Sequence, residues 1–292
     1  MTLAEPRRSS HNRRMVKQPL IEEAAARVGG RERMPEGDAS NSSRRGTRGE
    51  AAALARFPAA LRPFYRTASL PCPYVEGRTE RKLITEIGGH DASRFYSELS
   101  RAGFRRSHHL AYRPACAGCA SCVPVRLLVE RFEPSRTLRR TIAANADLAA
   151  RSVAARASAE QFKLFARYQR SRHAESDMAS MTYGDYRAMI EDSPVPTMLL
   201  ELRAPGESLV ATCLVDLLDD GLSAVYSFFD PDAAARSPGT YVILALIDEA
   251  RRRALPYVYL GYWIGESRKM AYKTRFRPLE ALTSQGWAPF AV

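Results

Sequence analysis

The sequence predicts an α/β (α+β) protein in which a smaller, cysteine-containing α+β domain precedes a larger C-terminal domain. Three observations lead to this prediction. Short strand-like runs and four of the five cysteines fall within residues 64–135. Three β-rich runs separated by turn sequences follow between residues 197 and 229. A helical pattern and one more strand then complete the order strand, strand, strand, helix, strand.

The chain has an ordinary composition but an unusual charge. It has 292 residues, of which 45% are hydrophobic and 26% charged, which suits one large or two modest domains. Lys and Arg number 44 against 32 Asp and Glu, giving a formal net charge of +12 at pH 7. Such a charge attracts polyanions. Nucleic acid is the first partner to consider and an anionic membrane surface the second. The alternative is an arginine-rich composition without such a partner.

We expect a cytoplasmic protein. The opening residues contain several arginines but no apolar run of the length that a secretory signal needs. The longest apolar run lies near Tyr241–Ile247 and is too short to span a bilayer. In that compartment, five cysteines indicate free thiols or metal ligands rather than disulfides.

Composition also divides the chain into four segments. Residues 1–60 are predicted to be a disordered basic tail, because they are rich in Arg, Glu, Gly and Ser and nearly lack aromatic residues. Residues 61–135 are predicted to form the cysteine-containing domain. Residues 136–157 are basic and alanine-rich, which predicts a helical connector. Residues 158–288 are predicted to form the C-terminal domain.

Three elements are expected in the first folded segment. Glu80–Ile87 is predicted to be a strand from its imperfect alternation of apolar and polar residues. Asp91–Ala102 is predicted to be a helix that Gly103 stops. Val123–Val129 is predicted to be a strand with Pro124 near its start.

The C-terminal segment has clearer elements. Ser158–Arg172 shows the spacing of an amphipathic helix, and Ser158 followed by Gln161 predicts a capping box at its start. Turn sequences at 205–206 and 219–221 indicate antiparallel strands on either side. This order of elements is that of the back half of an N-acetyltransferase-like domain. The predicted elements are the strands Thr197–Leu202, Leu209–Leu218 and Ala224–Phe229, the helix Gly239–Arg253, and the strand Pro256–Gly261.

The cysteines form the strongest local motif. Cys116, Cys119 and Cys122 follow a CxxCxxC spacing with small residues between them, and Cys72 precedes them. Four thiolates suit tetrahedral zinc or an iron–sulfur cluster. Unliganded thiols are the alternative, because free cysteine is often simply buried. Cys213 lies inside a predicted strand and is assigned to the core.

Three further segments are candidates for anion binding. Residues 101–113 combine arginines with two histidines, and residues 257–278 interleave cations with aromatic residues that stack on bases. Solvated or core-packed faces are the alternatives. Arg236 and Gly239 open a helix, where free amides attract anions. Tyr241 stands where the pyrophosphate loop of acetyl-coenzyme A enzymes has a small residue, which argues against coenzyme A.

These segments together resemble the arginyl-tRNA–protein transferase family over about residues 62–287. The residues of these motifs are most similar to those of the bacterial branch, the aspartate/glutamate leucyltransferases. N-terminal motifs lie at Cys72–Lys82, Gly103–His108, Tyr112–Cys119, Cys122–Arg126 and Phe132–Arg136. C-terminal motifs lie at Tyr226–Pro231, Ser237–Tyr241, Tyr257–Trp263 and Lys269–Pro278.

The resemblance implies an activity and its partners. The family moves an aminoacyl group from tRNA to a protein with an acidic N-terminal residue, which marks that protein for degradation by the N-degron pathway. For this branch it implies leucyl-tRNA as donor, proteins with N-terminal Asp or Glu as acceptors, and no membrane. Aminolysis of the ester needs no nucleophile and no cofactor, since positioning and carbonyl polarisation suffice. In eukaryotic relatives, cysteines matching Cys72 and the Cys119–Cys122 region are linked to a metal or an iron–sulfur cluster.

Candidate residues follow from these requirements. An arginine binds a carboxylate through two hydrogen bonds, whereas a lysine is a point charge.

Rival functions are a coenzyme-A-dependent N-acetyltransferase, a non-enzymatic RNA-binding module, and a member of the same family that uses arginine as donor. The predicted acceptor-binding residues are Arg78, Lys82, Arg105, Arg106, Glu76 and Glu80; the catalytic pocket, Tyr226, Tyr262 and Trp263; the tRNA-binding residues, Arg236, Gly239, Lys269, Lys273 and Arg275; and the metal ligands, Cys72, Cys116, Cys119 and Cys122.

Overall fold

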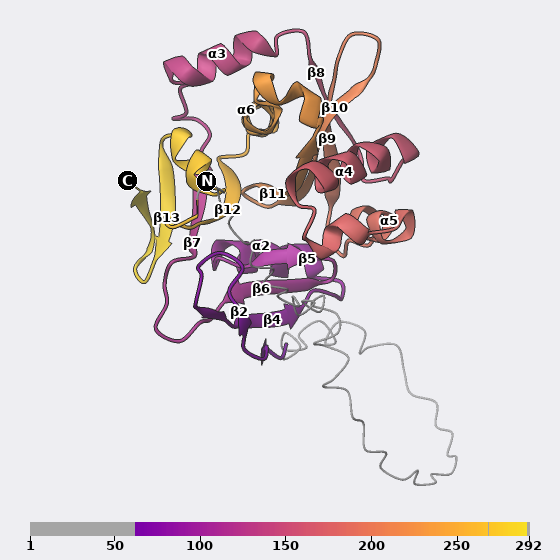
Figure 1. Ribbon diagram of the computed structural model, residues 1–292. Coiled ribbons are helices and arrows are strands. Elements are labelled where there is room, and N and C mark those ends of the chain that lie inside the picture. Colours follow the sequence, from indigo (N-terminus) through magenta and orange to yellow (C-terminus); the bar gives the residue numbers. More distant parts are fainter. Residues whose placement is uncertain (1–61, 268, 291–292) are drawn as a thin grey trace, which may run out of the picture.

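A computed structural model describes residues 62–267 and 269–290. The predicted tail at residues 1–60 lies outside this part of the chain. Figure 1 shows a small sheet at one end of the molecule and a larger one beside it, with helices around the larger sheet.

The small N-terminal sheet is antiparallel and is packed against one helix. Its strands have the order β1-β4-β6-β5. The helix α2 (Ala92–Arg101) contributes Tyr96 and Leu99 to a core that also holds Ile87 and Phe104. The expected strand Glu80–Ile87 is divided in two, because β3 pairs with β2 while β4 joins the sheet. The strands are β1 (Tyr65–Arg66), β2 (Leu70–Pro71), β3 (Thr79–Glu80), β4 (Lys82–Glu86), β5 (Arg105–Ser107) and β6 (Leu110–Pro114).

The large sheet has eight strands in the order β14-β13-β7-β12-β11-β10-β9-β8. Neighbouring strands are antiparallel except β11 and β12, which are parallel. Strand β7 comes from the segment predicted as the N-terminal domain, yet it lies between β12 and β13. The strands are β7 (Val123–Leu128), β8 (Ala149–Ala154), β9 (Thr197–Arg203), β10 (Leu209–Leu218), β11 (Gly221–Phe229), β12 (Tyr257–Trp263), β13 (Leu279–Thr283) and β14 (Gly286–Phe290).

Helices cover both faces of the large sheet. Leu199 and Leu214 face a cluster that contains Leu164 of α4, whereas Leu200 and Cys213 face the cluster of α6. This alternation is the period of a strand buried on both sides. The capping box at Ser158 and Gln161 is confirmed. The helices are α3 (Arg136–Ala144), α4 (Ala159–Arg172), α5 (Tyr183–Glu191) and α6 (Pro238–Arg252), and short 3₁₀ turns are η1 (Asp177–Ser180), η2 (Pro231–Arg236) and η3 (Ala271–Arg275).

The helical connector predicted at 136–157 is wrong in its second half. Helix α3 begins at the Ser135 cap and ends at Asn145, whose side chain donates to the carbonyls of Thr141 and Arg236. After the buried Leu148, residues 149–154 form β8 at the edge of the large sheet, paired with β9. The alanine-rich composition favours a helix, but an available sheet edge overrides that preference.

Candidate active site

The candidate site is the region where β11 and β12 separate, and this region is called the cleft below. The two strands are joined by α6 and pair only from Gly221↔Tyr257 to Ser223↔Tyr259. Beyond that point each strand carries a register shift against its other neighbour, at Val225 in β11 and at Leu260 in β12. Bulges of this kind turn backbone groups out of the ladder. Ligands of open α/β sheets bind at the carboxyl ends of such diverging strands.

Arg105 of β5 reaches into this cleft from the small sheet. Its Nη2 donates to the carbonyl oxygens of Ala224 at 2.7 Å and Val225 at 2.9 Å, at the bulge of β11. Its Nη1 is buried and has no hydrogen-bond partner among the described residues. Gly261 makes room for the guanidinium, because a Cβ at that position would lie 2.1 Å from Nη1.

Lys273 lies on the opposite wall of the cleft. Its Nζ donates to the carbonyl oxygen of Tyr262 in β12, and its side chain is buried. Burial, and then the nearby charge of Arg105, lower the pKa of Lys273 to about 7. The neighbouring Tyr272 is half-buried, and burial raises its pKa to about 12 against the opposing effect of Arg105.

An aromatic wall continues the cleft under α4. The Tyr226 hydroxyl accepts a hydrogen bond of 2.7 Å from Gln169, whose Oε1 is buried without a partner among the described residues. Tyr168 packs edge-on against Phe229 at 4.9 Å between ring centroids. Burial first, and then Lys269 and Arg172, lower the pKa of His173, so these cations gather at the rim of the wall.

The three predicted pocket residues therefore do not form one group. Tyr226 belongs to the aromatic wall. The Tyr262 hydroxyl donates toward the carbonyls of Gly103 at 2.9 Å and Tyr112 at 3.2 Å, which ties β12 to the small sheet. Trp263 packs against Phe290 of the C-terminal hairpin. Tyr262 and Trp263 thus support the cleft, and only Tyr226 lines its aromatic wall.

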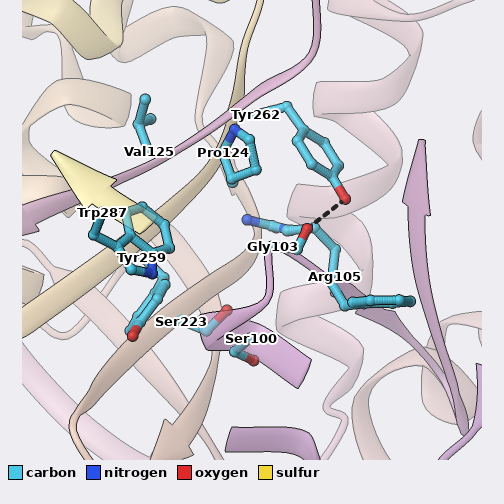
Figure 2. A pocket seen from close by; sticks show the side chains of 11 residues that line it. Ser100, Gly103, Arg105, Pro124, Val125, Ser223, Tyr259, Tyr262 and Trp287 are labelled. Atoms are coloured by element: carbon cyan, nitrogen blue, oxygen red, sulfur yellow. Dashed lines mark hydrogen bonds between the residues drawn. The ribbon is translucent and has the colours of Figure 1, made fainter. Parts of the chain in front are cut away.

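A small cavity lies between the two sheets and has room for about one water molecule (Figure 2). Arg105 and Gly261 line it, together with Gly103, Tyr259 and Trp287. Figure 2 shows the Arg105 side chain extending away from Tyr259 and Trp287. We place the candidate site where β11 and β12 diverge, next to this cavity.

Arg106 is not available as the predicted acceptor-binding cation. Its Nε and Nη2 donate to the two carboxylate oxygens of Asp216 at 2.8 and 2.7 Å. Both side chains are almost fully buried, at 1% and 0% exposure. Strand alternation explains the difference from Arg105, since adjacent residues of β5 point to opposite faces. Arg106 therefore joins the small sheet to β10 instead of meeting a substrate.

The other predicted acceptor residues lie in the β2–β3 hairpin, except Lys82, which belongs to β4 of the small sheet. Arg78 is exposed and donates to the Cys119 thiol at 3.2 Å and to the Ser121 hydroxyl at 3.4 Å. Lys82 forms an ion pair with the buried Glu80 at 2.9 Å. Glu76 is exposed. Arg78 is thus the predicted arginine that has no carboxylate partner among the described ion pairs and still reaches solvent.

The four predicted metal ligands gather around one loop. Burial, and then Cys72, Cys116 and Cys119, raise the pKa of the Cys122 thiol to about 11. Within residues 62–267 and 269–290, however, no three Cys, His, Asp or Glu side chains are arranged to hold a metal ion. Cys213 is buried in the core, as predicted.

The predicted tRNA contacts separate into two groups. Lys269 and Arg275 are exposed near the cleft. Arg236 instead forms an ion pair with Asp147 and donates to the Ala144 carbonyl, so it holds α3 against α6. Gly239 allows α6 to pack on the Phe229 ring, because a Cβ there would lie 2.9 Å from it. Arg236 and Gly239 are structural in this arrangement, which leaves the predicted phosphate site at this helix start without support.

Three residues of the site, Tyr168, Gln169 and Tyr272, are not evident as site residues from the sequence. Tyr168 and Gln169 lie on a helix whose aromatic spacing indicates core packing, and Tyr272 belongs to a segment with many aromatic residues. The feature that could have identified these residues is a polar group on a predicted buried face. A phenol or an amide carries a hydrogen-bond donor that simple packing does not need.

The fold is that of an α/β protein with an eight-stranded mixed sheet and a small antiparallel N-terminal sheet. Residues 70–140 match the model of the arginine-tRNA-protein transferase N terminus, and residues 160–283 match that of its C terminus. The chain belongs to the arginine-tRNA-protein transferase family.

Two relatives carry the name aspartate/glutamate leucyltransferase. That of Paramagnetospirillum magneticum is 60% identical over 78% of this chain and 93% of its own length. That of Gluconacetobacter diazotrophicus is 59% identical over 77% of this chain and 87% of its own. Among solved structures, FemX is similar at 8% identity and a TM-score of 0.41, covering 65% of each chain. This last likeness is too low to align site residues.

Proposed function

We propose that this protein transfers leucine from leucyl-tRNA to the α-amino group of proteins that begin with Asp or Glu. The proposal carries over to this chain the activity in the names of relatives that are 60% and 59% identical. Transfer marks such proteins for degradation by the N-degron pathway. We place the enzyme in the cytoplasm, where charged tRNA is available; no helix in the described ranges is long and apolar enough to cross a membrane.

The chemistry is aminolysis of an activated ester. The acceptor amine attacks the leucyl carbonyl carbon, and the ribose 3′ oxygen of tRNA leaves as an alcohol. An N-terminal amine has an unperturbed pKa of roughly 8, so part of it is neutral at physiological pH. The protein must align two substrates and stabilise the charge that develops on the carbonyl oxygen.

The observation that carries the choice of donor is the chemistry of the aromatic wall. The cations that affect the pKa values of Tyr168, Tyr272 and His173 are Arg105, Arg172 and Lys269. The carboxylates beside α4, Asp230 and Asp232, are paired with Arg167. Met178 and Tyr226 add apolar surface to the same cluster. An arginyl side chain would need a carboxylate here, because a buried charge requires a partner. A leucyl side chain needs only apolar contact.

Acceptor selection is assigned to Arg78, with Lys82 as a second cation. Arg78 is exposed and hydrogen-bonded only to neutral groups in the described contacts, so its fork is free to rotate onto a carboxylate. Glu80 and Glu76 belong to the same β2–β3 hairpin as Arg78 and are the candidates for the acceptor ammonium. Lys269 and Arg275 are assigned to the phosphates of the tRNA acceptor arm.

The cysteine loop is proposed, as its spacing predicts, to take up zinc or an iron–sulfur cluster away from the reacting atoms. Elemental analysis of protein purified under reducing, oxygen-free conditions tests this. A stoichiometric metal that Cys122→Ser abolishes would support it, and a metal-free protein with unchanged folding would contradict it.

Transfer assays test the function itself. Purified protein is given leucyl-tRNA or arginyl-tRNA together with peptides that begin with Asp, Glu, Lys or Ala. We expect leucine on the Asp and Glu peptides alone. Arginine on the same peptides would keep the family and change the donor. Binding of tRNA without transfer to any peptide would indicate an RNA-binding module, and acetylation with coenzyme A would indicate an acetyltransferase.

A further inference from the structure

Arg105, which is half-buried with a fully buried Nη1, and the buried Lys273 lie at the same site without a carboxylate partner among the described ion pairs. Neither forms an ion pair within the described residues, whereas the adjacent Arg106 is fully neutralised by Asp216. Both bind backbone carbonyls that the divergence of the strands leaves open, Arg105 on β11 and Lys273 on β12. Taking two like charges out of water is costly unless an anion or a loss of charge compensates. The pair therefore calls for a negative charge, or for deprotonation of the lysine.

The transfer reaction supplies a negative charge at one atom, the carbonyl oxygen of the ester. When the amine attacks, the carbonyl oxygen of the ester becomes negative, and only then does it need strong donors. Arg105 Nη1 is buried and lacks a partner, so it is held in place for such an oxygen. Gly261 has no side chain, and the Arg105 guanidinium occupies the space that a Cβ would need.

We propose that Arg105 donates to the carbonyl oxygen of the leucyl ester and that Lys273 accepts the proton that the attacking amine must lose. This inference rests on the proposed function. The N–C bond forms as the C–O3′ bond breaks, and the amine proton passes to Lys273 Nζ. The resulting ammonium then protonates the departing 3′ oxygen. Ester and amine become amide and alcohol, and Lys273 returns to its neutral state.

The surroundings of Lys273 keep a useful fraction of it neutral. The groups that act on it are the guanidinium of Arg105 from β5 and the Tyr262 carbonyl from β12. Burial and the positive Arg105 both oppose the ammonium form and set its pKa to about 7. A base of this kind matches a reaction at neutral pH. Lys273 is thus a catalytic residue in this account, and not the tRNA-binding cation that its sequence context suggests.

Steady-state kinetics of three variants test the assignment. Lys273→Met keeps the length and removes the base; Lys273→Arg keeps the positive charge but holds a proton at all relevant pH values. Lys269→Met removes a cation from the same segment at an exposed position. We expect kcat to fall on the order of 100- to 10,000-fold in both Lys273 variants. We expect Lys269→Met to raise KM for leucyl-tRNA with little change in kcat.

Correct folding of each variant is checked by its thermal unfolding and by its affinity for uncharged tRNA. If Lys273→Arg recovers the wild-type kcat, or if Lys273→Met changes only KM for leucyl-tRNA, Lys273 is a positioning or tRNA-binding residue and the inference is wrong.

A direct titration separates this inference from the proposed function. NMR of the lysine side chains, with the Lys273 signal assigned by its loss in Lys273→Met, measures its pKa without any substrate. We expect titration near neutrality and a wild-type kcat that rises over the same pH range. An ordinary lysine titration overturns the inference even if leucine transfer is observed. Absence of leucine transfer by the wild-type protein would overturn the proposed function instead.

Discussion

Gly261 is the residue on which the geometry of the cleft depends most directly. It has a φ of +75°, which costs a residue with a side chain about 1–2 kcal/mol. A Cβ would also overlap Arg105 Nη1. We predict that Gly261→Ala lowers kcat at least about tenfold by displacing the guanidinium. Gly286→Ala is the control, because it has a positive φ in open space away from the cleft. Equal kinetic effects of the two variants would contradict this role of Gly261.

Lys273 should also make the stability of the protein depend on pH. Its pKa is 10.5 when exposed and about 7 when folded, so between these values the unfolded chain binds the extra proton. Stability from this group therefore increases as pH rises through this window. The free energy of unfolding of the wild type relative to Lys273→Met should grow by about 1.4 kcal/mol per pH unit above pH 7. Denaturant unfolding at several pH values measures it, and a constant difference would contradict the lowered pKa.

At the scale of elements, Arg106 and Asp216 connect β5 to β10, and Thr197 adds a hydrogen bond of 3.0 Å to the same carboxylate. Removing one partner leaves a buried charge alone, so Arg106→Ala should destabilise the protein by about 3–5 kcal/mol. Replacing both residues by apolar ones should restore much of this loss. Denaturant unfolding measures the effect. Loss of acceptor selectivity in Arg106→Ala with stability unchanged would instead support a substrate contact.

The element α4 with η1 forms the wall assigned to the donor side chain. Met178 of η1 packs in that cluster. We predict that Met178→Asp lowers kcat/KM for leucyl-tRNA about tenfold or more and improves the relative use of arginyl-tRNA, because a carboxylate penalises an apolar side chain and pairs with a guanidinium. Ser180→Asp, at an exposed position of the same turn, is the control. An identical response to both donors would place the leucyl pocket elsewhere.

Across the whole molecule, the sequence patterns predicted the elements whose formation depends on neighbouring residues. The helices at 91–102, 158–172 and 239–253 and the strands around 197–229 follow from periodicity and capping, and the structure confirms them. The edge strand β8 and the place of β7 in the large sheet depend on partners distant in sequence, which composition does not reveal.

The site shows the same division. Arg105 and Arg106 are adjacent arginines that the sequence does not distinguish. In the structure, Arg106 pairs with Asp216 of β10, whereas Arg105 donates to a carbonyl at the bulge of β11. Lys273 has the sequence context of a surface cation, and only tertiary packing buries it. Sequence therefore predicted the residue types of the site, whereas their roles depended on contacts between the small sheet and the large one.

In our proposal, the leucyl ester binds where β11 and β12 diverge. A structure of the protein with a non-hydrolysable 3′-leucylamide of adenosine tests it most directly. We predict that the leucyl carbonyl oxygen accepts a hydrogen bond from Arg105 Nη1, with the side chain against Tyr168 and Tyr226. An analogue bound outside this cleft, with Arg105 and Lys273 untouched, would contradict the claim.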